Sequence, residues 1–285
     1  MPKKKTIHNF FEMKQKLEKI TFLTCYDYPM AVFSEKAGLD MLLVGDSLGM
    51  VVYGLDSTIP VTMDEMIIHT KAVRRGAPNT FVIGDMPFLS YQQSAEKAVQ
   101  NAGRFLKEAS ADAIKLEGGR RVIHQIKAIV DAGVLVMGHI GLTPQSSGQL
   151  GGFKAQGRSA DSAMELILDA DAIEQAGAFA LLLEAIPPEL GKIITERLRI
   201  PVLSIGAGIH CDGQLLIIGD MLGYFEAFTP KFVKKYADLA SIISKAYKDY
   251  VEDVKSMGFP EEKHTYKMPP EELKELEKML DKQKT

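Results

Sequence analysis

The sequence predicts an α/β protein built as a single (β/α)8 TIM barrel, and three observations support this fold class. Amphipathic stretches alternate with short apolar runs along most of the chain, a pattern typical of parallel strands covered by helices on both faces. Eight such runs can be found, the number of strands that a barrel needs. Titratable residues end five consecutive runs, and closing the sheet would bring all five to one place.

The candidate strands follow recognisable helix ends. Ala-Gly pairs at 37–38, 132–133 and 176–177 each precede an apolar run, and glycine is the usual residue just past a helix. The connection between the last two strands is short compared with the others. The predicted strands lie near residues 20–25, 41–46, 80–85, 112–117, 134–139, 179–184, 201–205 and 215–219.

Helix starts are also visible between the strands. Thr62 and Glu65 form a capping-box pattern before an amphipathic run that reaches Arg75. Serine is a favoured N-cap and proline is favoured in the first helical turn. On this basis further helices are expected to begin at Ser94, Ser159 and Pro187-Pro188.

The whole chain, 1–285, is expected to form one barrel domain with an addition at each end. Residues 1–18 predict a helix before the first strand, and residues 260–285 predict a charged helical tail on the surface or packed on a neighbour. The glycine-, serine- and glutamine-rich stretch 141–158 has little periodicity. Long loops of this kind are usually lids or binding loops, although a plain surface connection is the alternative.

The composition is that of a globular protein and excludes several classes of partner. Of the 285 residues, 46% are hydrophobic and 25% are charged, with a net charge of −3, so no nucleic acid partner is expected. No apolar run reaches the roughly 18 residues of a membrane span, and no secretory signal is visible. The two cysteines, Cys25 and Cys211, show no zinc spacing and fit a reducing cytoplasm.

The residues that end the five strands favour a closed barrel over an open, doubly wound sheet. In an open sheet with about 4.8 Å between neighbours, the outer two of five strands would stand roughly 19 Å apart. That distance is too wide for one small-molecule site. A barrel directs all five ends towards one axis, at the face where barrel active sites lie. The five residues are Asp46, Asp85, Glu117, His139 and Glu184.

Two opposite charges stand in an apolar run of sequence AIKLEGG, residues 113–119. On a strand, Lys115 and Glu117 share a face because side chains alternate. An isolated charge buried in the barrel would be costly. The pair is therefore either a structural ion pair or a pair whose partners are a metal ion and an anionic substrate, and these residues alone leave both interpretations open.

Two aspartates strengthen the interpretation as a metal site. Asp46 and Asp85 each follow a strand and a glycine, and such a glycine lets a ligand approach the backbone closely. Together with Glu117 they offer hard oxygen ligands of the type that Mg²⁺ prefers. Zinc is disfavoured because none of the 6 histidines stands in a metal-ligand pairing with another.

The last two strand ends offer a base and a polar contact. Glu184 lies among apolar residues, which can make a carboxylate a general base for a carbon acid; the alternative is a partner for the helix start that the prolines indicate. His139 could bind substrate or be structural. The residues thus predict a barrel that binds a divalent cation and removes a proton next to a carbonyl group, which gives an enolate.

Seven segments occur between about Thr21 and Phe228 in an order that carries a resemblance to a known family. They are LTCYDYPMA, VGDSLGMVVYG, GDMPF, KLEGG, GHIGLTPQS, LLEAIP and GAGIHCDGQ. With all of these segments in this order, the sequence resembles the ketopantoate hydroxymethyltransferase family. The resemblance covers most of the chain and shows no departure at the positions discussed below.

The resemblance implies a barrel enzyme of pantothenate and coenzyme A biosynthesis. It would transfer a hydroxymethyl group from 5,10-methylenetetrahydrofolate to 3-methyl-2-oxobutanoate and form ketopantoate. By the same resemblance, Asp46 and Asp85 would bind one Mg²⁺ per subunit with Glu117 completing the metal environment, and Glu184 would be the base. The keto acid would be held by Asp46, Ser47, Asp85, Lys115 and His139. A homodecamer, arranged as a pentamer of dimers, is implied as well.

Two rival functions are compatible with a barrel of this kind. A Mg²⁺-dependent lyase or mutase of the phosphoenolpyruvate mutase and isocitrate lyase type also stabilises an enolate, but the cysteine-centred loop of isocitrate lyase is missing here. A non-catalytic barrel that only binds a metabolite or supports assembly should have lost at least one carboxylate or the lysine. All of them are present.

Overall fold

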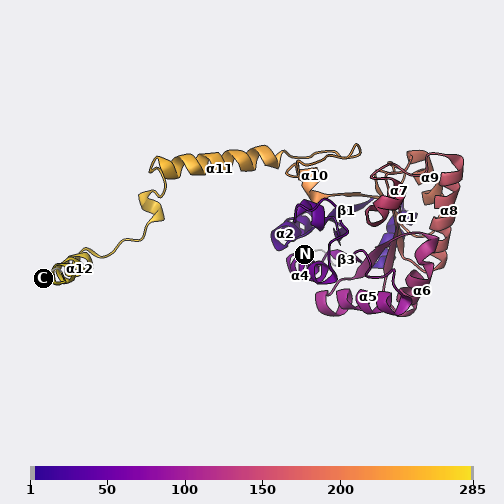
Figure 1. The fold of residues 1–285 in the computed structure, drawn as a ribbon, viewed down its shortest axis with the longest axis horizontal. Coiled ribbons are helices and arrows are strands. Elements are labelled where there is room, and N and C mark those ends of the chain that lie inside the picture. Colours follow the sequence, from indigo (N-terminus) through magenta and orange to yellow (C-terminus); the bar gives the residue numbers. More distant parts are fainter. Residues whose placement is uncertain (1–3, 284–285) are drawn as a thin grey trace. The chain divides into compact units, whose positions relative to one another are not determined.

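Eight parallel strands close into a barrel in the computed structural model, which describes residues 4–283. Each strand pairs with the next in the chain, and β8 pairs with β1. Helices surround the strands (Figure 1), so the predicted TIM barrel is confirmed. The strands are β1 Ile20–Thr24, β2 Met41–Val44, β3 Phe81–Asp85, β4 Ala113–Glu117, β5 Val136–Gly141, β6 Ala180–Glu184, β7 Val202–Ile205 and β8 Gly213–Leu216.

The helices begin where the capping residues predicted. The Thr62 side chain accepts from the backbone N–H of Glu65 at the start of α4, and Ser94 and Ser159 cap α5 and α8 in the same way. The helices before residue 238 are α1 Ile7–Gln15, α2 Tyr28–Ala37, α3 Leu48–Val51, α4 Met63–Gly76, α5 Ala95–Ala109, α6 Ile123–Asp131, α7 Ser147–Leu150, α8 Ala160–Gln175, α9 Pro188–Arg197 and α10 Ile218–Leu222, with 3₁₀ turns η1 Arg120–Val122 and η2 Pro144–Ser146.

The eighth strand lies earlier in the chain than predicted. The sequence predicts it near 215–219, but β8 spans Gly213–Leu216 and α10 begins at Ile218. The backbone N–H of Ile218 donates to the Thr24 side-chain hydroxyl at 2.9 Å instead of to a neighbouring strand. The chain therefore leaves the sheet at this point. The short connection from β7 to β8 carries a turn rather than a helix.

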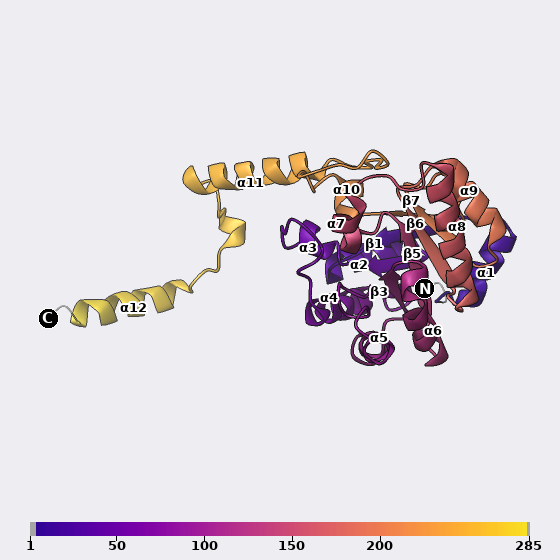
Figure 2. The same ribbon diagram turned by 45° about the vertical axis from the view of Figure 1, so that its right-hand side comes forward.

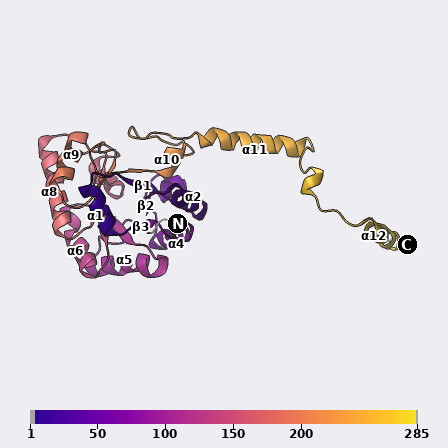
Figure 3. The ribbon, with the colours of Figure 1, turned by 180° about the vertical axis from the view of Figure 1, so that it is seen from behind.

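Apolar side chains fill the barrel interior at its amino-terminal end, and α1 covers that end. Inward side chains such as Met41, Ile83 and Leu203 form one apolar cluster with Phe10 and Met13 of α1. The rings of Phe10 and Phe81 meet edge to face with 5.2 Å between centroids, a favourable aromatic geometry. Figure 3 shows α1 against the strands. The amino-terminal end of the barrel is therefore packed, which leaves the carboxyl-terminal end for a site.

A second apolar layer lies between the strands and the outer helices. The alternate side chains of the strands, such as Leu42, Val82 and Ile114, pack there against the helices that Figure 2 shows around the barrel. Gly84 belongs to this layer, since a Cβ there would stand 2.2 Å from the Phe105 ring of α5. The prediction that this glycine admits a ligand is therefore wrong; it makes room for a helix.

Contacts within the chain divide it into two compact units, the first ending at Ala237 and the second beginning at Asp238. The second unit contains α11 Leu239–Lys255, η3 Glu262–His264 and α12 Pro270–Lys282. Helices are thus confirmed within 1–18 and 260–285, while residues 1–3 and 284–285 lie outside the described part. The single domain over 1–285 stays a prediction. Within residues 4–283, no helix is long and apolar enough to cross a membrane.

Candidate active site

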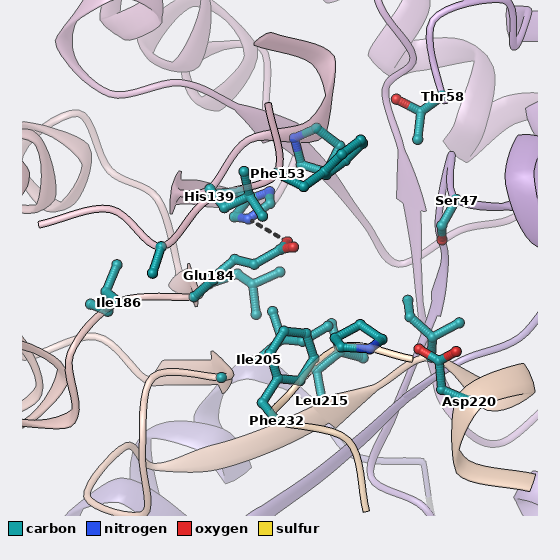
Figure 4. A pocket seen from close by; sticks show the side chains of 18 of the residues that line it. Ser47, Thr58, His139, Phe153, Glu184, Ile186, Ile205, Leu215, Asp220 and Phe232 are labelled. Carbon is teal, nitrogen blue, oxygen red and sulfur yellow. Dashed lines mark ion pairs between the residues drawn. The ribbon is translucent and has the colours of Figure 1, made fainter. Parts of the chain in front are cut away.

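A cavity of about 670 Å³ opens at the carboxyl-terminal ends of the strands. All the site residues predicted from the sequence line it, and they come from the ends of five different strands of the barrel. They are Asp46, Ser47, Asp85, Lys115, Glu117, His139 and Glu184. The expectation that distant strand ends share one site is confirmed, and Figure 4 shows part of this cavity.

Strand register explains why the charged residues meet. Asp85 is the register partner of Lys115, and Glu117 is the register partner of His139. Because residues in register on neighbouring parallel strands project to the same side, these four side chains all enter the barrel mouth. Glu184 ends β6 one strand further round.

Lys115 is the centre of a buried ion cluster. Its ammonium nitrogen lies 2.8 Å from both oxygens of Asp85 and 3.5 Å from Oε1 of Glu117, and it is only 3% exposed. Burial by itself lowers the pKa of Lys115, but the surrounding carboxylates outweigh burial and raise it. Burial would likewise raise the pKa of Glu117, but Lys115 and His139 lower it below its ordinary value. The lysine is therefore held fully charged.

Asp46 lies just beyond β2, not on the strand as predicted. Its backbone N–H donates to Oδ2 of Asp85 at 3.2 Å, and its side chain is buried. Burial and the negative charges of Asp85 and Glu117 raise the pKa of Asp46 well above its usual range. Burial also raises the pKa of Asp85, although Lys115 opposes the shift. Three carboxylates share one ammonium group, so negative charge is in excess at this point.

His139 bridges this cluster to Glu184. Nδ1 lies 3.4 Å from Oε1 of Glu117, and Nε2 lies 3.2 Å from Oε2 of Glu184; the second contact is the dashed line in Figure 4. Neither contact has hydrogen-bond alignment. Burial and the charge of Lys115 lower the pKa of His139, but the two carboxylates outweigh them and raise it to about 8.

The chain turns sharply behind Glu184. Ala185 has φ 48°, a left-handed conformation that costs a non-glycine residue about 1 kcal/mol or more. Gly141 lies alongside, and a Cβ there would stand 2.2 Å from the Glu184 carbonyl oxygen. The close approach of the two strand ends therefore requires glycine at position 141. The result is that the partly exposed Glu184 carboxylate projects into the cavity.

Gln145 contacts the predicted site residues directly, and the sequence prediction missed it. It belongs to η2 and is buried, and its Nε2 donates to Oδ2 of Asp46 at 2.8 Å. Its backbone N–H donates to Oε2 of Glu117 at 3.0 Å, and the Tyr91 hydroxyl lies 2.8 Å from its Oε1. The first part of the stretch 141–158 is thus a buried support for the acids, while Phe153, Ala155 and Arg158 line the cavity.

Replacing Gln145 by alanine should weaken Mg²⁺ binding and activity by about 10- to 100-fold, the usual cost of losing a group that orients a metal ligand. The reason is that Asp46 loses the side-chain donor at its Oδ2, whereas the backbone N–H that donates to Glu117 is kept. The measurement is activity against Mg²⁺ concentration. Gln149→Ala is the matched control, because Gln149 is exposed and its amide oxygen accepts a hydrogen bond from Arg121, away from the acids. An unchanged Mg²⁺ requirement in Gln145→Ala would contradict the proposed support.

The carboxylates at the cavity floor are oxygen donors of the kind that Mg²⁺ prefers. Among residues 4–283, no group of three or more His, Cys, Asp or Glu side chains has the spacing of a metal site. Asp46 and Asp85 are adjacent, however, and Mg²⁺ usually takes one or two carboxylates and completes its shell with water and substrate oxygens. The two aspartates and the excess negative charge therefore fit Mg²⁺, whereas direct ligation by Glu117 stays a prediction.

The cavity also holds polar residues away from the acid cluster. The Ser47 hydroxyl lies 2.8 Å from the Tyr26 hydroxyl. Thr58 and Asp220 are buried, and Oγ1 of Thr58 and Oδ1 of Asp220 have no hydrogen-bond partner. No sequence motif distinguishes Thr58 or Asp220 from ordinary polar residues, so only the structure places them in the cavity.

The closed barrel and the acids and lysine at its carboxyl-terminal face define the class of protein: a TIM barrel enzyme with its site at the usual end. The model of the family described as ketopantoate hydroxymethyltransferase matches residues 4–262, and the chain belongs to this family of transferases. It is 62% identical over 266 residues to 3-methyl-2-oxobutanoate hydroxymethyltransferase from Alkaliphilus metalliredigens, covering 93% of this chain and 94% of the relative.

Other relatives agree with this assignment. The 3-methyl-2-oxobutanoate hydroxymethyltransferase of Carboxydothermus hydrogenoformans is 53% identical over 271 residues, covering 95% of this chain and 98% of the relative. Among solved structures, 2,3-dimethylmalate lyase, a member of the phosphoenolpyruvate mutase and isocitrate lyase superfamily, matches with a TM-score of 0.58 at 18% identity, covering 99% of this chain and 98% of the other. That likeness shows the shared barrel fold.

Proposed function

We propose that this enzyme transfers a hydroxymethyl group from 5,10-methylenetetrahydrofolate to 3-methyl-2-oxobutanoate, and that the reaction proceeds through an enolate at a Mg²⁺ site. The product would be ketopantoate. The observation that supports this proposal best is the meeting, in one cavity, of a buried lysine and two aspartates with the carboxylate of Glu184. A bound cation and a lysine to hold an oxo acid, together with a base for its carbon–hydrogen bond, are what enolate formation needs.

The first task of the site is to bind an anion and polarise its keto group. Mg²⁺ held by Asp46 and Asp85 would act as a Lewis acid that stabilises negative charge on the keto oxygen. Lys115 would add a fixed positive charge, which in a buried site is worth more than in water. Ser47 would offer its hydroxyl as a further contact. Lys115 would then face the anionic substrate and Glu117 the metal ion, so the two opposite charges would have different partners.

The second task is to move a proton and form a carbon–carbon bond. Glu184 would remove the proton from C3 of the keto acid, and the resulting carbon nucleophile would attack the methylene carbon of the folate as one of its two C–N bonds breaks. Water would then displace the second nitrogen and supply the hydroxyl group, and tetrahydrofolate would leave with one proton from Glu184 and one from the water. His139, with its raised pKa of about 8, would be largely protonated at neutral pH. Its positive charge would hold the Glu184 carboxylate in position beside the substrate.

Removal of metal with EDTA should lower ketopantoate formation by at least about 100-fold, because a Lewis acid contributes several kcal/mol. Added Mg²⁺ should restore the rate. The measurement is ketopantoate formed from 3-methyl-2-oxobutanoate and methylenetetrahydrofolate, with phosphonopyruvate as the comparison substrate. Turnover of phosphonopyruvate without ketopantoate formation would contradict the proposal and favour the lyase or mutase alternative.

We also propose a cytoplasmic homodecamer, a pentamer of dimers, as the family resemblance implies. Helix α11 supports assembly by its surface, because its apolar side chains recur at helical spacing yet are exposed in the single chain. They include Ile243, Tyr247, Tyr250 and Val254. A cytoplasmic location is supported by Cys25 and Cys211, which are both free thiols, as is usual in reducing compartments.

A further inference from the structure

The cavity is larger than a small keto acid requires. Its volume of about 670 Å³ lies within the roughly 300–1,000 Å³ of sites that enclose drug-sized ligands. Beyond the acid cluster its walls are mainly apolar, with several aromatic rings. These residues include Met50, Val51, Phe153, Phe225, Phe228 and Phe232. The cavity therefore has both the room and the flat apolar surfaces for a second reactant with a conjugated ring.

One buried carboxylate in this part of the cavity has no protein partner for Oδ1. Asp220 of α10 is 4% exposed and lines the cavity. Burial raises its pKa to about 6 and the charge of Lys235 opposes the shift, so it is mostly ionised at neutral pH. A buried polar atom left without a partner is costly and uncommon. The arrangement is understandable if a ligand supplies the missing donor.

Asp220 stands apart from the proposed base Glu184 and from His139 (Figure 4). Figure 4 shows Ser47, Thr58 and Asp220 on one side of the cavity and His139 and Glu184 on the other. Helices α10 and α3 lie next to each other, since a Cβ added at Gly219 would stand 3.0 Å from the Val51 side chain. The unpaired hydroxyl of Thr58 is a second polar group on that side.

The position of Asp220 is fixed by contacts that do not involve its side chain. The N–H of Ile218 at the start of α10 donates to Thr24 of β1 at 2.9 Å. The end of the helix is closed by Gly223, whose N–H donates to the Asp220 carbonyl at 3.2 Å. The carboxylate is thus carried on an anchored backbone and is free to meet a ligand.

We propose that Asp220 binds the pterin ring of the folate co-substrate by accepting from its ring N3–H and its 2-amino group. This inference rests on the proposed function and deepens it. A 2-amino-4-oxopyrimidine presents two adjacent N–H donors, which match the two oxygens of a carboxylate. The Thr58 hydroxyl can donate to the neighbouring ring carbonyl. Asp220 is thereby a specificity residue for the one-carbon donor.

The test pairs a residue change with a ligand change. Wild-type protein and Asp220→Asn are assayed with 5,10-methylenetetrahydrofolate and with its 2-desamino-2-methyl analogue, which lacks the exocyclic amine. The wild type should prefer the natural donor by about 10- to 100-fold in kcat/KM, as expected for a charge-assisted hydrogen bond. In Asp220→Asn this preference should fall below about threefold, with the KM for the natural donor raised.

Two controls separate this proposal from a structural role and from the proposed function. Asp56→Asn removes an exposed charge from the Thr58 loop and should keep the wild-type preference. Exchange of the keto acid C3 hydrogen without folate reports on the acid cluster; a loss of exchange in Asp220→Asn that matches its loss of kcat/KM would overturn the assignment. An unchanged preference in Asp220→Asn would overturn it too. If the wild type forms no product with the natural donor, the proposed function itself fails.

Discussion

Glu184→Gln should lower the exchange of the C3 hydrogen of 3-methyl-2-oxobutanoate with D₂O by about 10²- to 10⁴-fold, the usual contribution of a positioned general base. The amide keeps the shape of the side chain but cannot take up the proton. Exchange is followed by NMR in the presence of Mg²⁺ and without folate, so that only the proton transfer is measured. Ketopantoate formation should fall by a similar factor, because the carbon nucleophile no longer forms.

The matched control for this experiment is Glu189→Gln. Glu189 lies five residues further on, in the first turn of α9, and is exposed. Its replacement should leave exchange within about twofold of the wild type, since exposed substitutions have small effects. Exchange at the normal rate in Glu184→Gln would show that another group removes the proton, and His139, which lies 3.2 Å from Glu184, would then be the next candidate.

Lys115→Met should destabilise the fold by about 3–5 kcal/mol, the cost of removing one partner from a buried ion pair. Methionine fills much of the same space, but Asp85 and Glu117 lose the cation that lies within 3.5 Å of both. The free energy of unfolding is measured by urea titration in EDTA. Lys127→Met is the control, because the Lys127–Asp131 pair is on the surface of α6 and such pairs contribute at most about 1 kcal/mol.

A double variant separates stability from catalysis. Adding Asp85→Asn to Lys115→Met removes a charge that the first change left without its partner, so part of the lost stability should return. Activity should not return, because the proposed anion-binding charge of Lys115 and the proposed metal ligand Asp85 are both missing. If the double variant is no more stable than Lys115→Met alone, the ion pair is not what holds this part of the barrel together.

The fold was predictable because each strand and helix carries a local signal. Apolar runs, capping residues such as Thr62 and turn glycines such as Gly38 act within a few residues of their position, and all of them agree with a barrel. The strand ends were predictable for a related reason. Once the parallel strands form a closed barrel, the alternation of side chains along each strand directs Asp85, Lys115 and Glu117 into its carboxyl-terminal opening.

The remaining features depend on contacts between distant segments, which leave no local pattern. Gln145 reaches Asp46 across 99 positions of sequence, and the start of α10 is set by Thr24 across 194 positions. Gly84 is an example of a local pattern that misleads. Its position before Asp85 suggested room for a ligand, but the Phe105 ring occupies that space. Asp220 could be assigned only after its surroundings were known, because what distinguishes it is a missing partner.

Helix α1 has a consequence for the order in which the reactants arrive. Phe10, which is fully buried, closes the amino-terminal end of the barrel, so both proposed substrates have to enter and leave at the carboxyl-terminal end. The acids stand at the bottom of that passage and the phenylalanines nearer its rim. The keto acid should therefore enter first and leave last, and saturating folate should slow its escape in a rapid-mixing or isotope-trapping experiment.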